Sequence, residues 1–376
     1  MSEPPRDNPR RIVVKIGSAV VVTEGQLDRT RVDRLAAEVG ALLDAGGVEV
    51  VVVSSGAVAG GASLLGLGEM PTSILDKQAA AAIGQQRLMR AWGEALAEAG
   101  GRTAAQVLLT SDDLEHRARF LNARHTLERL LEAGVVPIVN ENDSVSFDEI
   151  KLGDNDRLGA LVAVALDADL LVVLSSVEGL LDEGGRVVGL VEDLDAAGAL
   201  VRDDRSSTGV GGMTTKLDAV RIVADSGIDA VLAPGARRGA LLDAVEGRAV
   251  GTRIPARATS PNARKSWIAH SHRPKGSITI DAGAVSALRD RGASLLPKGV
   301  TGLEGAFEMG AVIEIVDAGG ASIARGLASY SARDIRRIMG RRGDEIESIL
   351  GYRYDDAIVH RDDLALTPRV RPEPST

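Results

Sequence analysis

Two lysines that stand beside glycines are the residues of this chain best suited to phosphate chemistry. Lys15 follows an apolar run and precedes Gly17, and Lys216 ends the sequence Gly-Val-Gly-Gly-Met-Thr-Thr-Lys at residues 209–216. Glycines let backbone N–H groups approach a phosphate closely, and a lysine adds positive charge. Each motif alone also has a non-functional explanation: Lys15 could be a solvated lysine at a strand end, and residues 209–216 could be a flexible surface loop. Together they favour a polyphosphate site.

Two clusters of amide and carboxylate side chains lie between these lysines, one at a predicted strand end and one at a predicted helix start. They are Asn140, Glu141, Asn142 and Asp143 in the first, and Asp154, Asn155 and Asp156 in the second. Ligands bind at the carboxyl ends of strands in open α/β sheets. Such side chains suit a small ligand with an ammonium and a carboxylate group, or they hold a lysine in place. The alternative is that they only form turns and helix caps.

A third candidate is the sequence Ser-Ser-Gly-Ala at residues 54–57, which follows an apolar run. The Ser55 hydroxyl and the N–H groups of a helix start would form an anion cradle, although the same sequence is also a common strand-to-helix turn. The Walker pattern Gly-x-x-x-x-Gly-Lys-Ser/Thr does not occur in the chain. Phosphoryl transfer fits these pieces because it depends on positioning and charge neutralisation more than on covalent chemistry by the protein.

The composition is that of an ordinary globular protein of two or three domains, with 376 residues, 44% of them hydrophobic and 26% charged. The absence of cysteine excludes disulfides, thiolate metal sites and cysteine nucleophiles. A formal net charge of −9 argues against nonspecific nucleic-acid binding by the whole protein. No apolar run approaches the roughly 18 residues of a membrane span, and the polar start does not resemble a secretory signal. We expect a cytoplasmic protein.

Unbroken apolar runs that alternate with helical ones predict a parallel sheet covered on both faces. The predicted strands are residues 11–16, 48–53, 107–109, 135–139, 170–174 and 230–232, and the predicted helices are residues 32–43, 74–99, 120–133, 158–166 and 216–226. Residues 74–99 fit one long helix or two helices broken near Gly84. The order of the strands cannot be read from the sequence.

The chain changes character after residue 253, where shorter and more β-like segments follow a stretch with two prolines. We predict a disordered N-terminus at residues 1–10, an α/β domain at 11–253, a linker at 254–264, a small β-rich domain at 265–363 and a polar tail at 364–376. In the second domain the predicted strands are residues 277–280, 311–316 and 321–327, and the predicted helices are 284–291 and 332–338.

The ordered set of motifs resembles the glutamate 5-kinase family of the amino acid kinase superfamily. The motifs are Val-Val-Lys-Ile-Gly-Ser, Ser-Ser-Gly-Ala, Val-Asn-Glu-Asn-Asp, Ile-Lys-Leu-Gly-Asp-Asn-Asp and Gly-Gly-Met-Thr-Thr-Lys, with further similarity at residues 77–85 and 120–124. Residues 294–299, 349–352 and 359–363 resemble the C-terminal PUA domain of many members. The resemblance implies a three-layer αβα sandwich around a mainly parallel sheet, the amino acid kinase fold, plus a small C-terminal β-rich PUA-like domain.

The resemblance also implies ATP-dependent phosphorylation of the γ-carboxylate of L-glutamate, the first step of proline biosynthesis. Lys15 and Lys216 would neutralise charge on the transferring phosphoryl group, and Asp156 would hold both lysines. The implied glutamate ligands are Ser55, Asp143, Asn155 and Asp154. The implied nucleotide ligands are Lys15, Ser175, Ser176, Val210, Gly211, Gly212, Met213, Thr214, Thr215 and Lys216. Mg²⁺ would accompany ATP, held by phosphate oxygens and water and by no protein ligand.

The chain departs from the family pattern at two nucleotide positions. The family usually has Thr-Asp or Ser-Asp where this chain has Ser175 and Ser176, and it usually has threonine at the position of Val210. A carboxylate is therefore missing on the nucleotide side. These departures bear on nucleotide contacts and not on the reaction.

The resemblance implies several partners beyond the substrates. Proline would inhibit by competing at or beside the glutamate pocket, glutamyl phosphate would be handed to a reductase, and the protein would be a homo-oligomer, either dimer or tetramer. One alternative is another member of the superfamily, such as an acetylglutamate, aspartate or uridylate kinase.

A second alternative is an RNA-binding regulatory protein, because PUA domains elsewhere bind RNA. Residues 262–376 carry 17 Lys and Arg residues against 15 Asp and Glu residues. This balance is far from the basic footprint of a nucleic-acid binder, so we expect no tight RNA binding.

Overall fold

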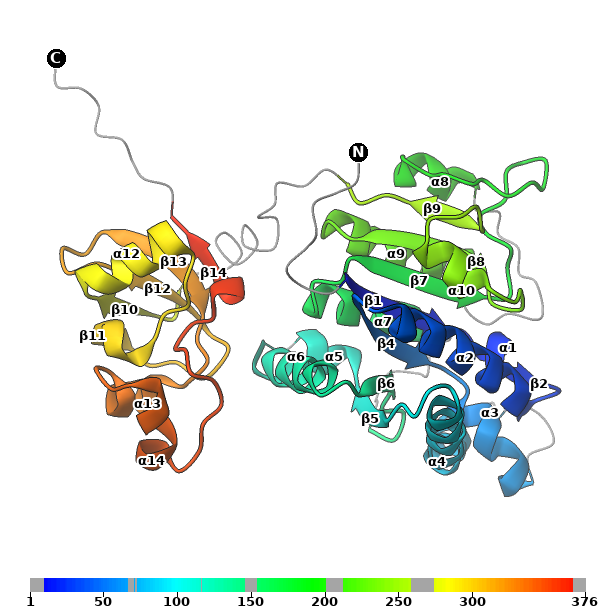
Figure 1. Ribbon diagram of the computed structural model, residues 1–376, viewed down its shortest axis with the longest axis horizontal. Coiled ribbons are helices and arrows are strands. Elements are labelled where there is room, and N and C mark those ends of the chain that lie inside the picture. Colours follow the sequence, from blue (N-terminus) through cyan, green and yellow to red (C-terminus); the bar gives the residue numbers. More distant parts are fainter. Residues whose placement is uncertain are drawn as a thin grey trace, which may run out of the picture. The chain divides into compact units, whose positions relative to one another are not determined.

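The computed structural model describes residues 10–66, 71, 73–115, 117–145, 154–200, 212–257 and 274–367. These residues form two compact units, one built mainly from residues up to 257 and the other mainly from residues 274–367 (Figure 1). No described helix combines the length and the apolar character that crossing a membrane requires. Each unit is built around its own sheet.

The first unit is organised around a seven-stranded sheet with the order β5-β6-β4-β1-β7-β8-β9. In that order the strands are β5 (Ala104–Leu109), β6 (Val136–Glu141), β4 (Val48–Ser54), β1 (Arg10–Ile16), β7 (Leu170–Ser175), β8 (Asp229–Pro234) and β9 (Thr252–Ile254). Every neighbouring pair is parallel except β8 with β9, which is antiparallel. The prediction of a mainly parallel α/β sheet is therefore confirmed.

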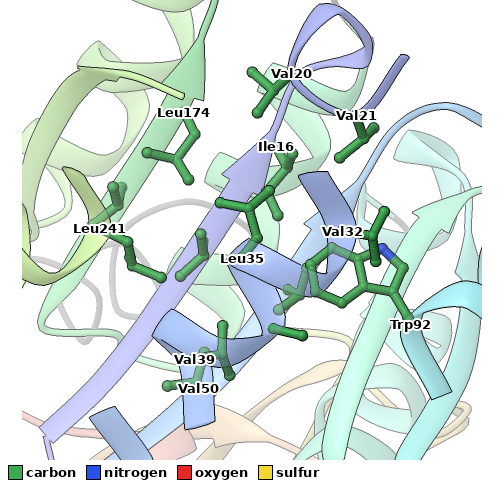
Figure 2. Packing of buried hydrophobic residues seen from close by; sticks show 14 of the residues in the cluster. Ile16, Val20, Val21, Val32, Leu35, Val39, Val50, Trp92, Leu174 and Leu241 are labelled. Atoms are coloured by element: carbon green, nitrogen blue, oxygen red, sulfur yellow. The ribbon is translucent and has the colours of Figure 1, made fainter. Parts of the chain in front are cut away.

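Along each central strand, side chains point alternately to the two faces of the sheet. They therefore pack against the two helical layers in turn. Ile16 of β1 packs in a buried cluster with Leu35 and Trp92 on one face (Figure 2), and Ile12 belongs to the same cluster. Lys15, between them, points to the other face. Apolar residues on both faces explain why the sequence of this strand is nearly unbroken in its hydrophobicity.

Helices cover both faces of the sheet and complete a three-layer αβα sandwich (Figure 1). One layer contains α2 (Arg29–Ala45), α4 (Ile74–Glu98) and α10 (Ala240–Val245), and the other contains α7 (Asp154–Ala165) and α9 (Met213–Asp225). The shorter or peripheral elements are α1 (Ser18–Val21), β2 (Val22–Thr23), β3 (Gln26–Leu27), α3 (Ala57–Ala62), α5 (Ser111–Glu115), α6 (Arg117–Glu132) and α8 (Leu194–Leu200).

Helix α4 runs without a break through Gly84, which settles the choice between one helix and two. A Cβ atom added at Gly84 would lie 1.8 Å from the carbonyl oxygen of Ala57 in α3. Gly61 of α3 is equally confined, because its added Cβ would lie 2.0 Å from the carbonyl oxygen of Ala80. These glycines therefore permit the close approach of two helices and do not end one.

The second unit contains a five-stranded sheet with the order β11-β10-β12-β13-β14. The strands are β11 (Val300–Gly305), β10 (Gly276–Ile280), β12 (Val312–Val316), β13 (Ser322–Leu327) and β14 (Leu364–Leu366), and the helices are α12 (Ala282–Arg291), α13 (Ala332–Ile338) and α14 (Ile346–Leu350). Its core includes Ile278, Ile315, Tyr330 and Ile335. The predicted β-rich second domain is confirmed.

Three of the predicted boundaries are wrong by a few residues. The predicted polar tail begins too early, because Leu364 and Ala365 are buried in β14, which pairs with β13. The predicted disordered start ends too late, since Arg10 already belongs to β1 and its N–H donates to the Gly47 carbonyl at 2.8 Å. Ile254, assigned to the linker, is buried in β9. At each of these boundaries, pairing with a neighbouring strand extends the folded unit beyond the range predicted from the sequence.

Candidate active site

The candidate site lies where four parallel strands end side by side. Because β6, β4, β1 and β7 are adjacent and parallel, their carboxyl ends meet at one edge of the sheet. Asn140 is the second-last residue of β6, Ser55 follows β4, Lys15 lies near the end of β1 and Ser175 ends β7. The backbone N–H of Ser55 donates to the Ile16 carbonyl at 3.1 Å, which keeps the ends of β4 and β1 together. The predicted clusters from distant parts of the sequence thus share one edge.

Lys15 is buried, with 5% of its surface exposed. Helix α7 passes close to it, because a Cβ atom added at Gly159 would lie 3.2 Å from both Cβ and Cγ of Lys15. A larger residue at Gly159 would therefore push α7 away from β1. This close packing brings the first turn of α7, with Asp156, against the lysine side chain.

Asp156 contacts both candidate phosphate-binding lysines. Its Oδ1 lies 2.5 Å from Nζ of Lys15, and its Oδ2 lies 3.2 Å from Nζ of Lys216. The Thr215 hydroxyl has two acceptors for its single proton, the same Oδ2 at 3.1 Å and the Gly212 carbonyl at 3.0 Å, and its position holds the start of α9 beside this carboxylate. Asp156 is 1% exposed and Lys216 is 7% exposed. We call Lys15, Asp156 and Lys216 the lysine–aspartate cluster.

Burial and charge act against each other on the titration of this cluster. Burial lowers the pKa of Lys15 below its ordinary value, although the adjacent Asp156 carboxylate opposes this shift. Burial alone would raise the pKa of Asp156, but the two lysines outweigh it and hold that pKa below its usual range. Two ammonium groups and one carboxylate carry a net charge of +1 in a buried place. Such a charge attracts an anion that can enter the site.

A second group of contacts surrounds the adjacent residue, Asn155. Its Nδ2 donates to the Ser55 hydroxyl at 2.7 Å and to Oδ1 of Asn140 at 3.1 Å. Asn140 in turn donates from Nδ2 to Oε1 of Gln85 in α4 at 2.8 Å. Oδ1 of Asn155 is buried and has no hydrogen-bond partner within the described part of the chain. The hydroxyl proton of Ser55 and this oxygen are a donor and an acceptor of the kinds that bind a carboxylate and an ammonium group.

The strand end below Ser55 is held by a buried tryptophan. Trp92 of α4 donates from its indole N–H to the Ser54 hydroxyl at 3.0 Å, and that hydroxyl donates to the carbonyl of Ser55 at 3.1 Å. Ser54 and Trp92 are both fully buried. A buried indole N–H needs a partner, so this contact fixes the spacing between α4 and the end of β4.

The structure thus brings together six of the residues selected from the sequence, in two adjacent groups. Lys15, Asp156, Lys216 and Thr215 form one group, and Ser55 and Asn155 form the other. Ser175 is buried at the end of β7, Ser176 is exposed beside it, and Asp143 is half-buried two residues after β6. Gly212, Met213 and Thr214 lie at the start of α9. Val210, Gly211 and the side chain of Asp154, whose backbone begins α7, lie outside what the structure describes.

The sequence analysis did not assign Gln85 or Trp92 to the site, and it named Asn140 only as a member of the first amide and carboxylate cluster. Gln85 and Asn140 stand within the motifs that carry the family resemblance, but nothing in the sequence indicates that they are hydrogen-bonded to each other across 55 positions. The predicted strand ends at residue 139, whereas β6 continues through Glu141, so Asn140 is buried within the strand. The sequence feature that could have indicated a role for Asn140 is its position as a polar residue directly after the apolar run at residues 135–139.

Comparison with known families matches both units. The model of the amino acid kinase family matches residues 10–234, and the model of the PUA domain matches residues 276–350. A carbamate kinase structure from Giardia aligns with a TM-score of 0.50 at 19% sequence identity, covering 66% of this chain and 99% of that one, which shows likeness of fold alone. The fold and the buried site at the strand ends therefore define an amino acid kinase with an added PUA domain.

Relatives of nearly the same length show to which family within this class the chain belongs. A glutamate 5-kinase of Myxococcus xanthus is 49% identical over 365 residues, which are 95% of this chain and 96% of that protein. Glutamate 5-kinases of Geobacter sulfurreducens and Thermus thermophilus are 47% and 46% identical, each over 95% of this chain and 97% of theirs. The chain belongs to the glutamate 5-kinase family.

Proposed function

We propose that this protein transfers the γ-phosphoryl group of ATP to the γ-carboxylate of L-glutamate. The observation that carries the proposal is the lysine–aspartate cluster, in which one buried carboxylate holds two ammonium groups, one near the end of β1 and one in the first turn of α9. Its net positive charge suits a reaction in which negative charge must be brought together and stabilised. The names of the full-length relatives supply the acceptor, glutamate.

The reaction needs charge stabilisation and alignment more than an acid or a base. An oxygen of the ionised γ-carboxylate attacks the γ-phosphorus of ATP, the bond from that phosphorus to the β,γ-bridging oxygen breaks, and ADP leaves with the electron pair. The carboxylate is already deprotonated at neutral pH because its ordinary pKa is about 4.3. We assign Lys15 and Lys216 to neutralising charge on the transferring group. Asp156 is then the residue that fixes the two ammonium groups.

We assign the glutamate pocket to Ser55, Asn155, Asp143 and Asp154. In support, Ser55 and Asn155 are hydrogen-bonded to each other beside the lysine–aspartate cluster, and Asn155 is the sequence neighbour of Asp156. A hydroxyl donor, an amide acceptor and carboxylates suit the α-carboxylate and α-ammonium groups of an amino acid. Recognition of these groups would leave the γ-carboxylate directed toward the lysines.

We assign the nucleotide side to Ser175, Ser176 and the segment Val210, Gly211, Gly212, Met213, Thr214, Thr215 and Lys216, together with Lys15. Among the described residues no group of three or more His, Asp or Glu side chains is arranged to hold a metal ion. The carboxylate of Asp156 is occupied by two lysines. As the resemblance implies, the nucleotide substrate is proposed to be MgATP, with its ion held by phosphate oxygens and water.

Several further properties of the family are proposed for this chain. The product would enter proline biosynthesis by hand-off to a reductase, proline would inhibit at or beside the glutamate pocket, and the chain would act in the cytoplasm as a dimer or tetramer. These proposals rest on the resemblance to the family.

A coupled assay of ADP release tests the central proposal. We expect release with L-glutamate and MgATP, and none above background with N-acetylglutamate, aspartate or UMP as the acceptor. The same assay with added proline tests inhibition. Activity with another of these acceptors and none with L-glutamate would refute the proposal.

A further inference from the structure

Three side-chain amides from three different elements are hydrogen-bonded in series, beginning at Asn155 of the proposed glutamate pocket. Asn155 at the start of α7 donates to Asn140 of β6, and Asn140 donates to Gln85 of α4. Gln85 is 8% exposed and Asn140 is 2% exposed. We call Gln85, Asn140 and Asn155 the amide relay.

The amide relay has a direction, because each amide has a donor end and an acceptor end. In the structure every donor points from Asn155 toward Gln85. The relay therefore ends in an acceptor, Oδ1 of Asn155, and a donor, Nε2 of Gln85, both buried and without a hydrogen-bond partner among the described residues. Turning one amide around would set two donors or two acceptors against each other, so all three must turn together.

The direction of the relay decides which group Asn155 offers to a ligand. In the observed direction its Nδ2 is used by Ser55 and Asn140, and its Oδ1 is left to accept a hydrogen bond. In the opposite direction Oδ1 would be used by the neighbouring donors, and Nδ2 would be left over. An acceptor suits the ammonium group of an amino acid, whereas a donor repels it.

Gln85 is held in place by the packing of its own helix. The preceding residue, Gly84, allows α4 to pack directly on α3, and Trp92, two turns later, is bonded to Ser54. Both contacts tie α4 to elements outside the relay. These contacts fix the backbone position of Gln85, and in the structure its Oε1 accepts from Asn140.

We propose that Gln85 is a positioning residue for the amino-acid substrate, an inference that rests on the proposed function. By accepting the hydrogen bond of Asn140 it sets the direction of the amide relay, so that Asn155 presents an oxygen and not an N–H group. The ion pairs and the hydrogen bond that define the lysine–aspartate cluster do not involve Gln85. Its effect should therefore fall on glutamate binding and not on the phosphoryl-transfer step.

Two substitutions separate the acceptor of Gln85 from its donor. Gln85→Met has similar length but removes the acceptor, so Asn140 loses its partner and the relay loses its fixed direction. Gln85→Glu keeps oxygen acceptors at this end and removes the N–H donor. The control is Gln86→Met, which changes the neighbouring exposed glutamine of the same helix.

Initial rates of ADP release measure KM for L-glutamate, KM for MgATP and kcat, and thermal unfolding measures stability in parallel. For Gln85→Met we expect KM for L-glutamate to rise about tenfold, the effect of one hydrogen bond, with kcat and KM for MgATP changed less than about twofold. For Gln85→Glu we expect KM for L-glutamate to remain within about threefold of wild type, a restoration that mere packing would not produce.

Two outcomes would overturn the proposal. If Gln85→Met lowered only the melting temperature and left KM for L-glutamate unchanged, Gln85 would be a structural residue. If Gln85→Glu raised this KM as much as Gln85→Met did, an acceptor at position 85 would not be what matters. The wild-type rate with L-glutamate, measured in the same assay, tests the proposed function separately, so failure of one is distinguishable from failure of the other.

Discussion

The ammonium group of Lys15 lies 2.5 Å from the carboxylate of Asp156, although the two residues are far apart in the sequence. Lys15 is the second-last residue of β1 and Asp156 lies in the first turn of α7, and the absence of a side chain at Gly159 lets these two elements approach. A buried ion pair of this kind is weak evidence for stability, because desolvation costs about as much as the attraction returns. The second carboxylate oxygen of Asp156 contacts Lys216, which indicates instead that Asp156 serves to place two cations together.

Replacing Lys216 with alanine should lower kcat by on the order of 100- to 1,000-fold, because one fixed charge at a transferring phosphoryl group is worth several kcal/mol. Initial-rate measurements with L-glutamate and MgATP test this. The matched control is Arg221→Ala, which removes a cation from the same helix, one that pairs with Asp195. Near-normal turnover of Lys216→Ala would show that the phosphate site is assigned to the wrong residues.

Replacing Asn155 with alanine should act mainly on glutamate binding. The change removes the hydrogen bonds to Ser55 and Asn140 and the free acceptor, and we expect KM for L-glutamate to rise about tenfold or more, with a smaller effect on KM for MgATP. The exposed residue Asn122, replaced in the same way, is the control. A variant whose KM rises for MgATP alone would move Asn155 to the nucleotide side.

The sequence was sufficient to predict the class of fold and most elements, because the signals are local. Residues 50–53 are buried on both faces in β4, as an unbroken run of four valines indicates. The predicted ends of helices and strands were less accurate where hydrogen bonding to a neighbouring strand determines them. Leu364–Leu366 reads as the start of a polar tail, yet it is an edge strand because β13 supplies its hydrogen bonds.

The contacts of the site were predictable only in part, since most of them join residues distant in sequence. The resemblance implied that Asp156 holds both lysines, and the geometry agrees with this. The link from Gln85 to Asn140 depends on the strand order, which places β6 beside β4 and which no local pattern encodes. Glu38 is a similar case: this buried residue of α2 accepts from the N–H groups of Gly239 and Leu241 at the start of α10.

Replacing Asp156 with asparagine should destabilise the first unit in a pH-dependent way. Two buried ammonium groups lose their counter-charge, which costs about 3–5 kcal/mol at neutral pH. The pKa of Asp156 is lower in the folded than in the unfolded state, so its contribution is fully present above the unfolded value of about 3.9 and is lost as the pH falls through the folded value.

Urea unfolding of wild type and Asp156→Asn at a series of pH values measures this difference. The gap between the two proteins should be largest near neutral pH and should narrow below about pH 4. Asp44→Asn, which removes the partner of Arg102 at a site where Asp44 is 62% exposed, should cost less than about 1 kcal/mol at every pH. A gap that stayed constant into acid would show that the pKa of Asp156 is not lowered by folding.

Replacing Gly84 with alanine should destabilise the first unit, although alanine is the better helix former by about 1 kcal/mol. The new Cβ would lie 1.8 Å from the Ala57 carbonyl oxygen and 2.6 Å from the backbone nitrogen of Gly61, so α3 must move away from α4. Overpacking of this kind typically costs about 1–3 kcal/mol. Gly93→Ala in the same helix is the matched control, because an added Cβ there meets nothing within 4 Å. Urea unfolding should therefore show opposite signs, with Gly93→Ala stabilised and Gly84→Ala destabilised, and equal effects at both positions would contradict the close packing of α3 on α4.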